Sequence, residues 1–108
     1  MHPEEPLADE MTLAAVMAAL SDPARVQIVR TLASEQERTC GAFDLGISKA
    51  TRSHHFKVLR EAGLTHTRSE GTHRYVSLRR EDADARFPGL LDAVLTAAER
   101  EAAAPALA

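Results

Sequence analysis

The residues best suited to chemistry in this sequence are basic, and most of them lie in one stretch. Residues 49–80 contain eight of the thirteen lysines and arginines but only two acidic residues, although the 108-residue chain carries a net charge of −3. Guanidinium and ammonium groups bind phosphate oxygens, and salt screening over about 10 Å makes the local charge decisive for DNA binding. A solvated basic surface would have the same composition. The eight residues are Lys49, Arg52, Lys57, Arg60, Arg68, Arg74, Arg79 and Arg80.

Histidine and cysteine do not form a pattern that predicts a metal site. His54 and His55 are adjacent, and neighbours on a helix point about 100° apart, so such a pair rarely binds one ion. We expect one of them to face DNA and the other to pack inward. The single cysteine, Cys40, could be a small buried hydrophobic residue, a redox-sensitive thiol or a lone metal ligand. We predict no metal and no cofactor.

The sequence also contains no motif for catalysis. It has no H-E-x-x-H, no G-x-S-x-G, no phosphate-binding loop and no clustered pair of acids. The acidic first ten residues do not resemble a signal peptide, and no apolar run approaches the roughly 18 residues that span a bilayer. One cysteine cannot form an internal disulfide. We therefore expect a cytoplasmic binding protein without catalytic residues and without membrane contact.

Predicted helices precede the basic stretch, and a further predicted helix contains its first residues. Asp22 is a good N-cap and is followed by a proline that suits a first helical turn. Ser48 can cap the clearest helix of the chain, and Gly63 can end it in the left-handed conformation. Asp9 and Thr39 are the caps expected for two other helices. Apolar spacing and caps together predict helices over residues 9–20, 23–33, 40–44 and 49–62.

After Gly63 the sequence pattern changes to period two. Residues 64–68 and 74–78 are rich in Thr, Tyr and Val, and they predict two short strands joined by a turn at Gly71. A helical turn over 81–86 and a last helix over 90–104 follow. We expect residues 1–7 to be a flexible segment and residues 8–104 to form one domain.

This order of elements is typical of a winged helix-turn-helix domain, mainly α with a β-hairpin wing, in the order α-α-α-α-β-β-α. A helix fits the major groove of DNA, its N-terminal residues meet the base edges, and the hairpin reaches the flanking backbone. An ordinary polar helix face is the alternative, and the basic stretch favours DNA. The predicted DNA-contacting residues are Ser48, Lys49, Thr51, Arg52, Ser53, His55, Lys57, Arg68, Thr72, His73 and Arg74.

Three segments resemble the ArsR/SmtB family of bacterial repressors. Residues 20–29 (LSDPARVQIV) resemble the start of the family's second helix, residues 48–64 (SKATRSHHFKVLREAGL) its recognition helix, and residues 70–78 (EGTHRYVSL) its wing. The resemblance implies a homodimeric repressor that pairs through its first and last helices and is released from its operator by an effector. The residues predicted for this pairing are Leu13, Val16, Met17, Leu90, Leu91, Val94, Leu95 and Ala98.

The sequence departs from the family pattern in two places. The segment Thr39–Ile47 is shorter than the helix that the family has before its recognition helix. The paired cysteines, or Asp/His and His/Glu pairs, of metal-sensing members are missing too. The effector therefore stays unidentified, either a small molecule or a redox signal.

The sequence as a whole predicts a sequence-specific DNA-binding regulator. Its expected partners are double-stranded DNA with a palindromic operator, a second copy of itself and the effector. A winged-helix module that binds another protein instead of an operator is the alternative. Normal binding to such a partner after Arg52→Ala and Lys49→Ala would favour that alternative.

Overall fold

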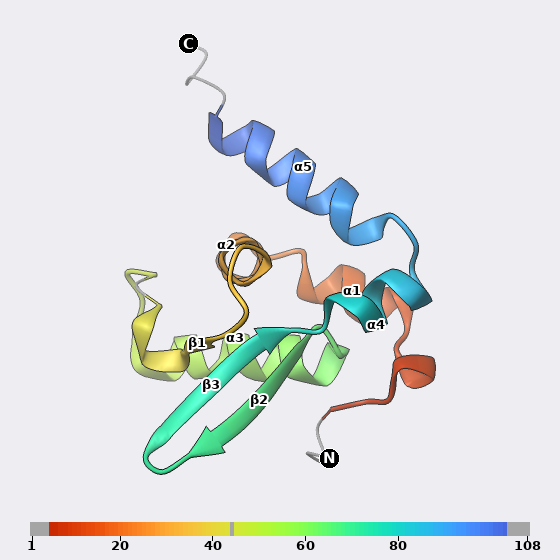
Figure 1. Cartoon of the computed structure of the whole chain (residues 1–108). Coiled ribbons are helices and arrows are strands. Elements are labelled where there is room, and N and C mark those ends of the chain that lie inside the picture. The colour runs from red at the N-terminus through yellow and green to blue at the C-terminus, as the bar shows by residue number, and fades with distance from the viewer. Residues whose placement is uncertain (1–4, 44, 104–108) are drawn as a thin grey trace.

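The computed structural model describes residues 5–43 and 45–103 and consists of helices around a small antiparallel sheet (Figure 1). No helix in these ranges is both long and apolar enough to cross a membrane. The α-helices are α1 (Leu13–Ala19), α2 (Pro23–Ala33), α3 (Lys49–Ala62), α4 (Arg80–Arg86) and α5 (Leu90–Ala103). Two 3₁₀ turns, η1 (Ala8–Glu10) and η2 (Cys40–Ala42), and the strands β1 (Arg38–Thr39), β2 (Thr65–Glu70) and β3 (His73–Leu78) complete the fold.

Local capping explains where the main helices begin and end. The side chain of Asp22 accepts a hydrogen bond from the backbone N–H of Ala24, and Ser48 Oγ accepts one from Thr51, as predicted. Gly63 ends α3 at a φ of +90°, which also confirms its prediction. The prediction for the first helix is wrong at its start, because Thr12 and not Asp9 caps α1 and the residues before it form η1.

The wing is the hairpin of β2 and β3, and a third strand joins its edge. β2 and β3 pair from Thr65 with Leu78 to Glu70 with His73, so both predicted strands are confirmed and the turn is tighter than expected. β1 pairs Arg38 with Val76, giving the order β1-β3-β2. A two-residue strand is too short to show period-two alternation, so the sequence could not predict it.

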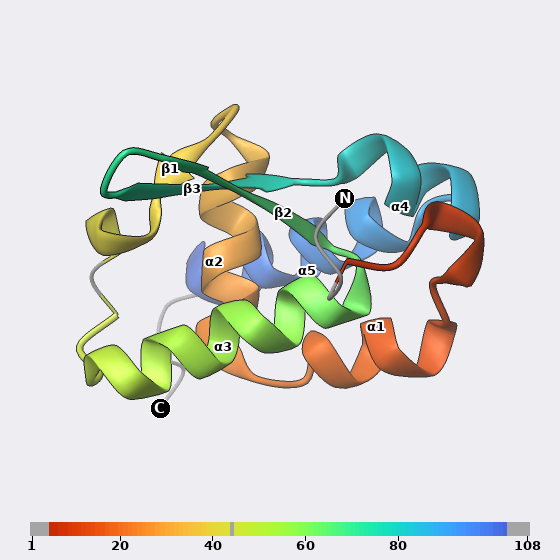
Figure 2. The same ribbon diagram turned by 90° about the horizontal axis from the view of Figure 1, so that it is seen from below.

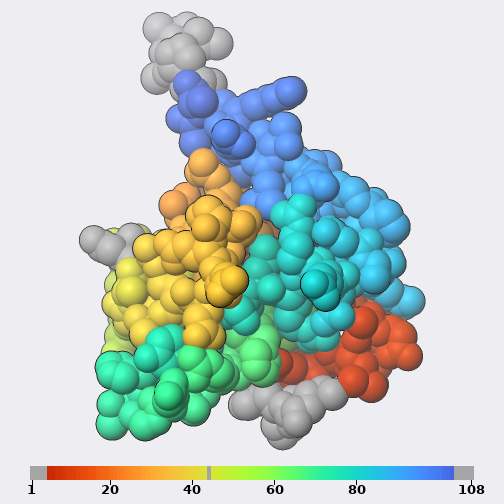
Figure 3. All heavy atoms as spheres, viewed as in Figure 1, coloured from red at the N-terminus to blue at the C-terminus, as the bar shows by residue number. Residues whose placement is uncertain are grey.

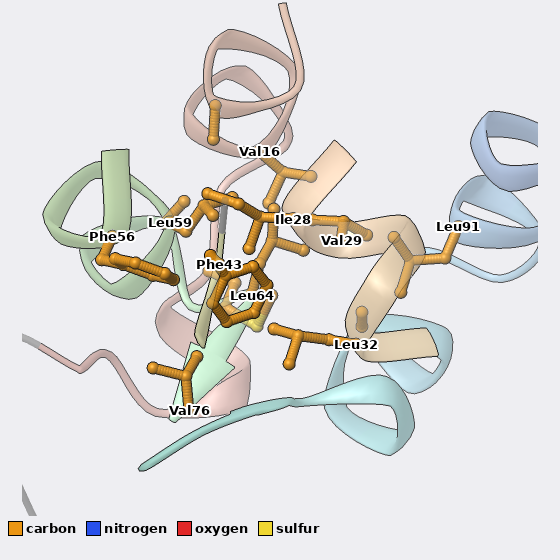
Figure 4. Close-up of a cluster of buried hydrophobic side chains, with 14 residues drawn as sticks. Val16, Ile28, Val29, Leu32, Phe43, Phe56, Leu59, Leu64, Val76 and Leu91 are labelled. Carbon is orange, nitrogen blue, oxygen red and sulfur yellow. The ribbon is translucent and has the colours of Figure 1, made fainter. Parts of the chain in front are cut away.

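The core lies where α1, α2 and α3 meet the sheet. Val16 of α1, Ile28 of α2 and Leu59 of α3 are fully buried and pack into one cluster with Leu64 and other apolar residues (Figure 4). Truncating a buried leucine such as Leu59 to alanine costs ~2–5 kcal/mol of stability in proteins. The inner side of α3 is therefore firmly anchored, and its other sides remain for binding.

The predicted third helix is reduced to the single turn η2. The side chain of Thr39 makes no capping hydrogen bond, and Asp44 lies outside the described residues. Gly46 has a φ of +66°, which a continuing helix cannot contain. In place of packing from a full helix, Phe43 packs edge-to-face on Phe56 of α3, with ring centroids 5.2 Å apart. The order α-α-α-α-β-β-α thus holds only with η2 as its third helical element, and α4 is added before α5.

The N-terminal segment is packed onto the wing rather than flexible where it is described. Glu5 is 6% exposed, and its carboxylate accepts hydrogen bonds from His66 Nδ1 (2.7 Å) and the backbone N–H of Thr67 (3.2 Å). Arg79 donates to the carbonyl of Pro6. Residues 1–4 and 104 of the predicted segments lie outside the described residues. The prediction of a flexible segment is therefore wrong for residues 5–7, because contacts from far along the chain hold them.

The wing tip and α5 lie at opposite ends of the molecule (Figures 1 and 3). α5 packs against α2 and α4 and extends from the body along one side. Figure 2 shows α3 running beneath the hairpin, with its N-terminal end near the wing tip and α1 beside its C-terminal half. The wing tip is thus well separated from α5, whereas α1 lies directly beside α3.

Candidate nucleic-acid interface

The N-terminal half of α3 is a capped helix end that faces solvent. The backbone N–H of Thr51 donates to Ser48 Oγ at 3.1 Å, and the Ser48 hydroxyl donates to Thr51 Oγ1 at 2.9 Å. Lys49 and Ser53 are exposed along this half, and Lys57 is exposed further along the helix. The first turn of a helix carries partial positive charge and favours phosphate oxygens. Ser48 and Thr51 therefore support a surface suited to an anionic ligand.

A groove of about 790 Å³ runs between α3, the wing and η2. Figure 2 shows these three elements meeting at one end of the molecule. Its chemistry is basic, because five of its lining residues are lysine or arginine, with His73 beside them. We call it the basic groove. Its lining residues are Thr39, Cys40, Gly41, Lys49, Arg52, Ser53, Phe56, Lys57, Arg60, Thr67, Thr72, His73 and Arg74.

The structure brings most of the predicted DNA-contacting residues into this groove. Helix residues and wing residues that are more than twenty positions apart in the sequence line the same space. Arg52 is half-buried there, and its Nη1 donates to the carbonyl of Phe43 at 3.4 Å. Ser48 and Thr51 lie at the adjoining end of α3. The predicted residues that line the groove are Lys49, Arg52, Ser53, Lys57, Thr72, His73 and Arg74.

His55 does not face this groove, so its predicted role in DNA contact is wrong. It is only 7% exposed, and its Nδ1 lies 3.0 Å from Nη1 of Arg25 on α2. His54 is the exposed member of the pair. One histidine of the pair is packed inward, as expected, but it is His55; that the other one faces DNA stays a prediction. The helical rotation of about 100° per residue separates them, and only packing against α2 decides which one is buried.

Arg68 is on the other face of the wing, where ion pairs hold it. Its guanidinium contacts Glu37 (2.6 Å) and Glu70 (2.7 Å) and lies 4.5 Å from the ring centroid of Tyr75. The hydrogen bonds to Glu37 and then Glu70 raise the pKa of Arg68, and the bond from Arg68 lowers the pKa of Glu37. The predicted DNA contact of Arg68 does not fit this placement, since Thr67 faces the groove and its neighbour in a strand faces away.

Arg60 lines the groove although the prediction left it out of the DNA-contacting residues. It is 9% exposed, with its chain packed along α3. A sequence signal for it existed. Residues 49, 53, 56 and 60 follow helical spacing, so they share one face of α3, and this face is the one that the groove exposes.

Cys40 also lines the groove and is half-buried. Burial raises the pKa of its thiol, while the nearby charges of Arg74 and Arg52 partly oppose that rise. A higher pKa leaves less of the reactive thiolate at neutral pH, which favours the inert interpretation over redox sensing. In residues 5–43 and 45–103, no three His, Cys, Asp or Glu side chains gather to hold a metal.

The residues predicted for pairing fall into two groups. Leu13 and Met17 lie one turn apart on α1 and are 53% and 54% exposed, and α5 adds Leu90, Val94 and Leu95, which are partly buried. Val16 (0%) and Leu91 (1%) belong to the core of a single chain, and Ala98 is 9% exposed. Direct pairing through Val16 and Leu91 does not fit the structure, because the same chain already covers both side chains.

Comparisons with known proteins match this chain to bacterial transcriptional regulators. The sequence profile of the bacterial regulatory protein arsR family matches residues 22–67, from α2 to the start of the wing. The chain is 45% identical over 87 residues to an uncharacterized HTH-type transcriptional regulator, YceK of Bacillus subtilis strain 168, covering 78% of this chain and 87% of that protein.

Solved structures of two regulators have the same architecture. The transcriptional repressor BigR from Xylella fastidiosa is 30% identical, with a TM-score of 0.62 over 79% of this chain and 84% of BigR. A possible transcriptional regulatory protein from Mycobacterium bovis is 31% identical, with a TM-score of 0.61 over 78% of this chain and 90% of that one. The winged helix-turn-helix fold is thereby confirmed.

Proposed function

Because the chain belongs to the ArsR family of bacterial regulatory proteins, we propose that it is a homodimeric repressor that binds a palindromic operator and is released by an effector. It is a DNA-binding transcriptional regulator with a winged helix-turn-helix fold. The observation that carries the proposal is the basic groove, in which α3 and the wing present five cationic side chains together. Operator binding would place the protein in the cytoplasm, where bacterial DNA lies.

The geometry of the groove suits a duplex. An α-helix of about 10–12 Å diameter fits the major groove of B-DNA, which is about 12 Å wide. Arg52 lies one turn into α3, where its planar fork can donate two hydrogen bonds to a guanine edge. Lys49 and Lys57 on α3 and Arg74 on the wing are suited to phosphates on either side. The helix would read the bases and the wing would hold the backbone.

The exposed leucine and methionine of α1 support pairing with a second copy. Leu13 and Met17 are among the few large apolar residues that the described chain leaves more than half exposed, and they lie on one side of one helix. A dimer with twofold symmetry would place two α3 helices about 34 Å apart, or a multiple of it, on one face of the duplex. BigR is named a transcriptional repressor, and we extend repression to this chain.

Titration of a fluorescent promoter fragment from this protein's own gene tests operator binding. We expect tighter binding than to a scrambled fragment of equal length. Neutralising about five phosphates per protomer predicts a log–log salt slope near −4 to −5 for each half-site. Equal affinity for both fragments, with a slope near zero, would contradict the proposal.

Sedimentation velocity tests the dimer. Leu13→Glu should shift the protein toward monomer, because it adds charge to a surface that has to be apolar for pairing. Leu7→Glu is the matched control, since Leu7 is 47% exposed but lies outside α1 and α5. Loss of the dimer in both variants, or in neither, would count against pairing through α1.

A further inference from the structure

A single guanidinium, that of Arg25 on α2, connects three helices. Its Nε donates to the carbonyl of Ala19 at 2.6 Å and its Nη2 to the carbonyl of Ala18 at 3.4 Å, both at the end of α1. Its Nη1 lies 3.0 Å from Nδ1 of His55 on α3. We call this set the Arg25 junction. The Ala18 carbonyl also accepts from the hydroxyl and the backbone N–H of Ser21, so the strongest bond of the junction to α1 is the one to Ala19. The junction ties this end of α1 to the recognition helix.

The chemistry of this junction determines the protonation state of His55. An arginine side chain only donates hydrogen bonds, so Nδ1 has to accept and carries no hydrogen. The imidazole is then neutral, with its hydrogen on Nε2. A second proton would place an N–H of a cation against the guanidinium and remove the bond. The junction therefore exists in one protonation state of His55.

The charged and titratable groups around His55 come from α2 and α3. The charged groups near His55 on α2 are Arg25, which contacts its Nδ1, and Asp22, whose carboxylate caps α2 by accepting from Ala24. His54 is the neighbouring titratable ring on α3, with its centroid 6.1 Å away. α1 contains no charged residue and contributes carbonyl oxygens.

The Arg25 junction lies between the helix proposed for pairing and the helix proposed for DNA recognition. α1 carries Leu13 and Met17, the surface proposed for pairing, and α3 carries the groove residues. His55 lies on the inner side of α3, two residues before Lys57. A bond between the end of α1 and the inner side of α3 therefore joins the pairing helix to the DNA-reading helix.

We propose that Arg25 is a positioning residue, which sets the angle of α3 on α1 through neutral His55, and that protonation of His55 loosens α3 and weakens DNA binding. The link to the pairing surface rests on the proposed function, whereas the junction itself does not. Histidine is the side chain that ordinarily changes charge between about pH 5 and 8, so mild acid is the signal that this arrangement would register.

The test compares His55→Asn with the wild type in operator titrations at different pH. A carboxamide oxygen can accept from Arg25 near the position of Nδ1 and does not titrate. We expect similar affinities at about pH 8, and at about pH 5.5 an affinity about tenfold weaker for the wild type than for the variant. His54→Asn is the matched control. His54 is exposed and lies outside the Arg25 junction, so His54→Asn should keep the wild-type loss of affinity at low pH.

NMR of the wild type without DNA gives a second readout. Long-range ¹H–¹⁵N spectra should show His55 with hydrogen on Nε2 at about pH 8, and acid should shift the amide signals of Ala18 and Ala19 at the end of α1 in the wild type but not in His55→Asn. Hydrogen on Nδ1, or equal shifts at the end of α1 in both proteins, would overturn the proposal. So would an affinity ratio between wild type and variant that is constant with pH. Failure to bind any operator would overturn the proposed function alone, and the NMR titration would still decide the junction.

Discussion

Basic residues from one stretch of sequence have two different surroundings in the folded chain. Lys49, Lys57 and Arg74 line the basic groove, and within residues 5–43 and 45–103 they form no ion pair. Arg79, by contrast, pairs with Asp82, and Arg80 pairs with Asp84 on its own helix and Asp92 on α5. Arg68 is similarly held on the outer face of the wing. The cations of residues 49–80 are thus divided between those that line the groove and those that form ion pairs within the fold.

This difference shows that the number of cations in a sequence overestimates the positive charge that is available for binding. A guanidinium already bonded to two carboxylates has to lose them before it can contact phosphate. Arg79 also bonds the carbonyl of Pro6, and Arg86 bonds that of Met11, so these side chains hold the N-terminal segment in place. Five of the eight cations of the stretch line the groove, and the remaining three stabilise contacts within the fold.

Removing charge from the basic groove should have the largest effect on DNA binding. The triple change Lys49→Gln, Lys57→Gln and Arg74→Gln should weaken operator binding more than any single change below, and reduce the salt slope by roughly 3 per protomer. The control Arg38→Gln, Arg68→Gln and Arg80→Gln has the same net charge but acts on ion-paired residues. It should change the slope by much less. Equal changes in both proteins, measured by fluorescence anisotropy, would remove the distinction.

Two substitutions of Arg52 distinguish recognition of a base from the effect of positive charge in the groove. Arg52→Ala should weaken operator binding by about 1–3 kcal/mol and relax the preference at one base pair. Arg52→Lys keeps the charge but loses the planar fork, so it should retain the salt slope and still lose that preference. Binding to a set of operators with single base-pair changes measures this. A wild-type preference in Arg52→Lys would show that Arg52 contacts phosphate.

The side-chain caps of α3 and α1 provide a further comparison, in which the expected effects are smaller. Ser48→Ala and Thr12→Ala each remove one side-chain cap and should each lower the free energy of unfolding by about 1 kcal/mol. Only Ser48 lies at the end of α3 that we propose to contact DNA, so only its variant should bind DNA more weakly than its stability predicts. Urea unfolding and anisotropy on both proteins test this, and an equal effect on DNA binding would contradict it.

The smallest effect is expected from the pH dependence of the outer wing face. Arg68 holds the pKa of Glu37 below its usual value, so the pair stabilises the fold above the ordinary carboxyl pKa and loses this contribution as the pH falls through the lowered one. The urea midpoint of Glu37→Gln should lie slightly below that of the wild type at neutral pH. The difference should shrink as the pH falls below the ordinary carboxyl pKa and vanish below the lowered pKa of Glu37. A difference that persists in acid would point to packing instead.

Local signals were sufficient to predict much of this fold. The caps at Asp22 and Ser48, the end of α3 at Gly63 and the two strands of the wing all depend on residues within a few positions of one another. The polar face of α3 follows from its helical period, and four predicted residues of this helix line the groove, namely Lys49, Arg52, Ser53 and Lys57. Where signals were weak, at residues 9–12 and 39–47, the predicted helices were wrong or incomplete.

The sequence by itself determined that the chain has a capped recognition helix followed by a basic wing, because capping, helical period and turn chemistry act over short distances. Only the tertiary structure decided which cations are available to a ligand and which histidine is buried. Those outcomes depend on Arg25 with His55, Glu37 with Arg68, and Glu5 with His66, which are 30, 31 and 61 positions apart. A contact between distant residues exists only once the core has brought their elements together, and no local pattern encodes it.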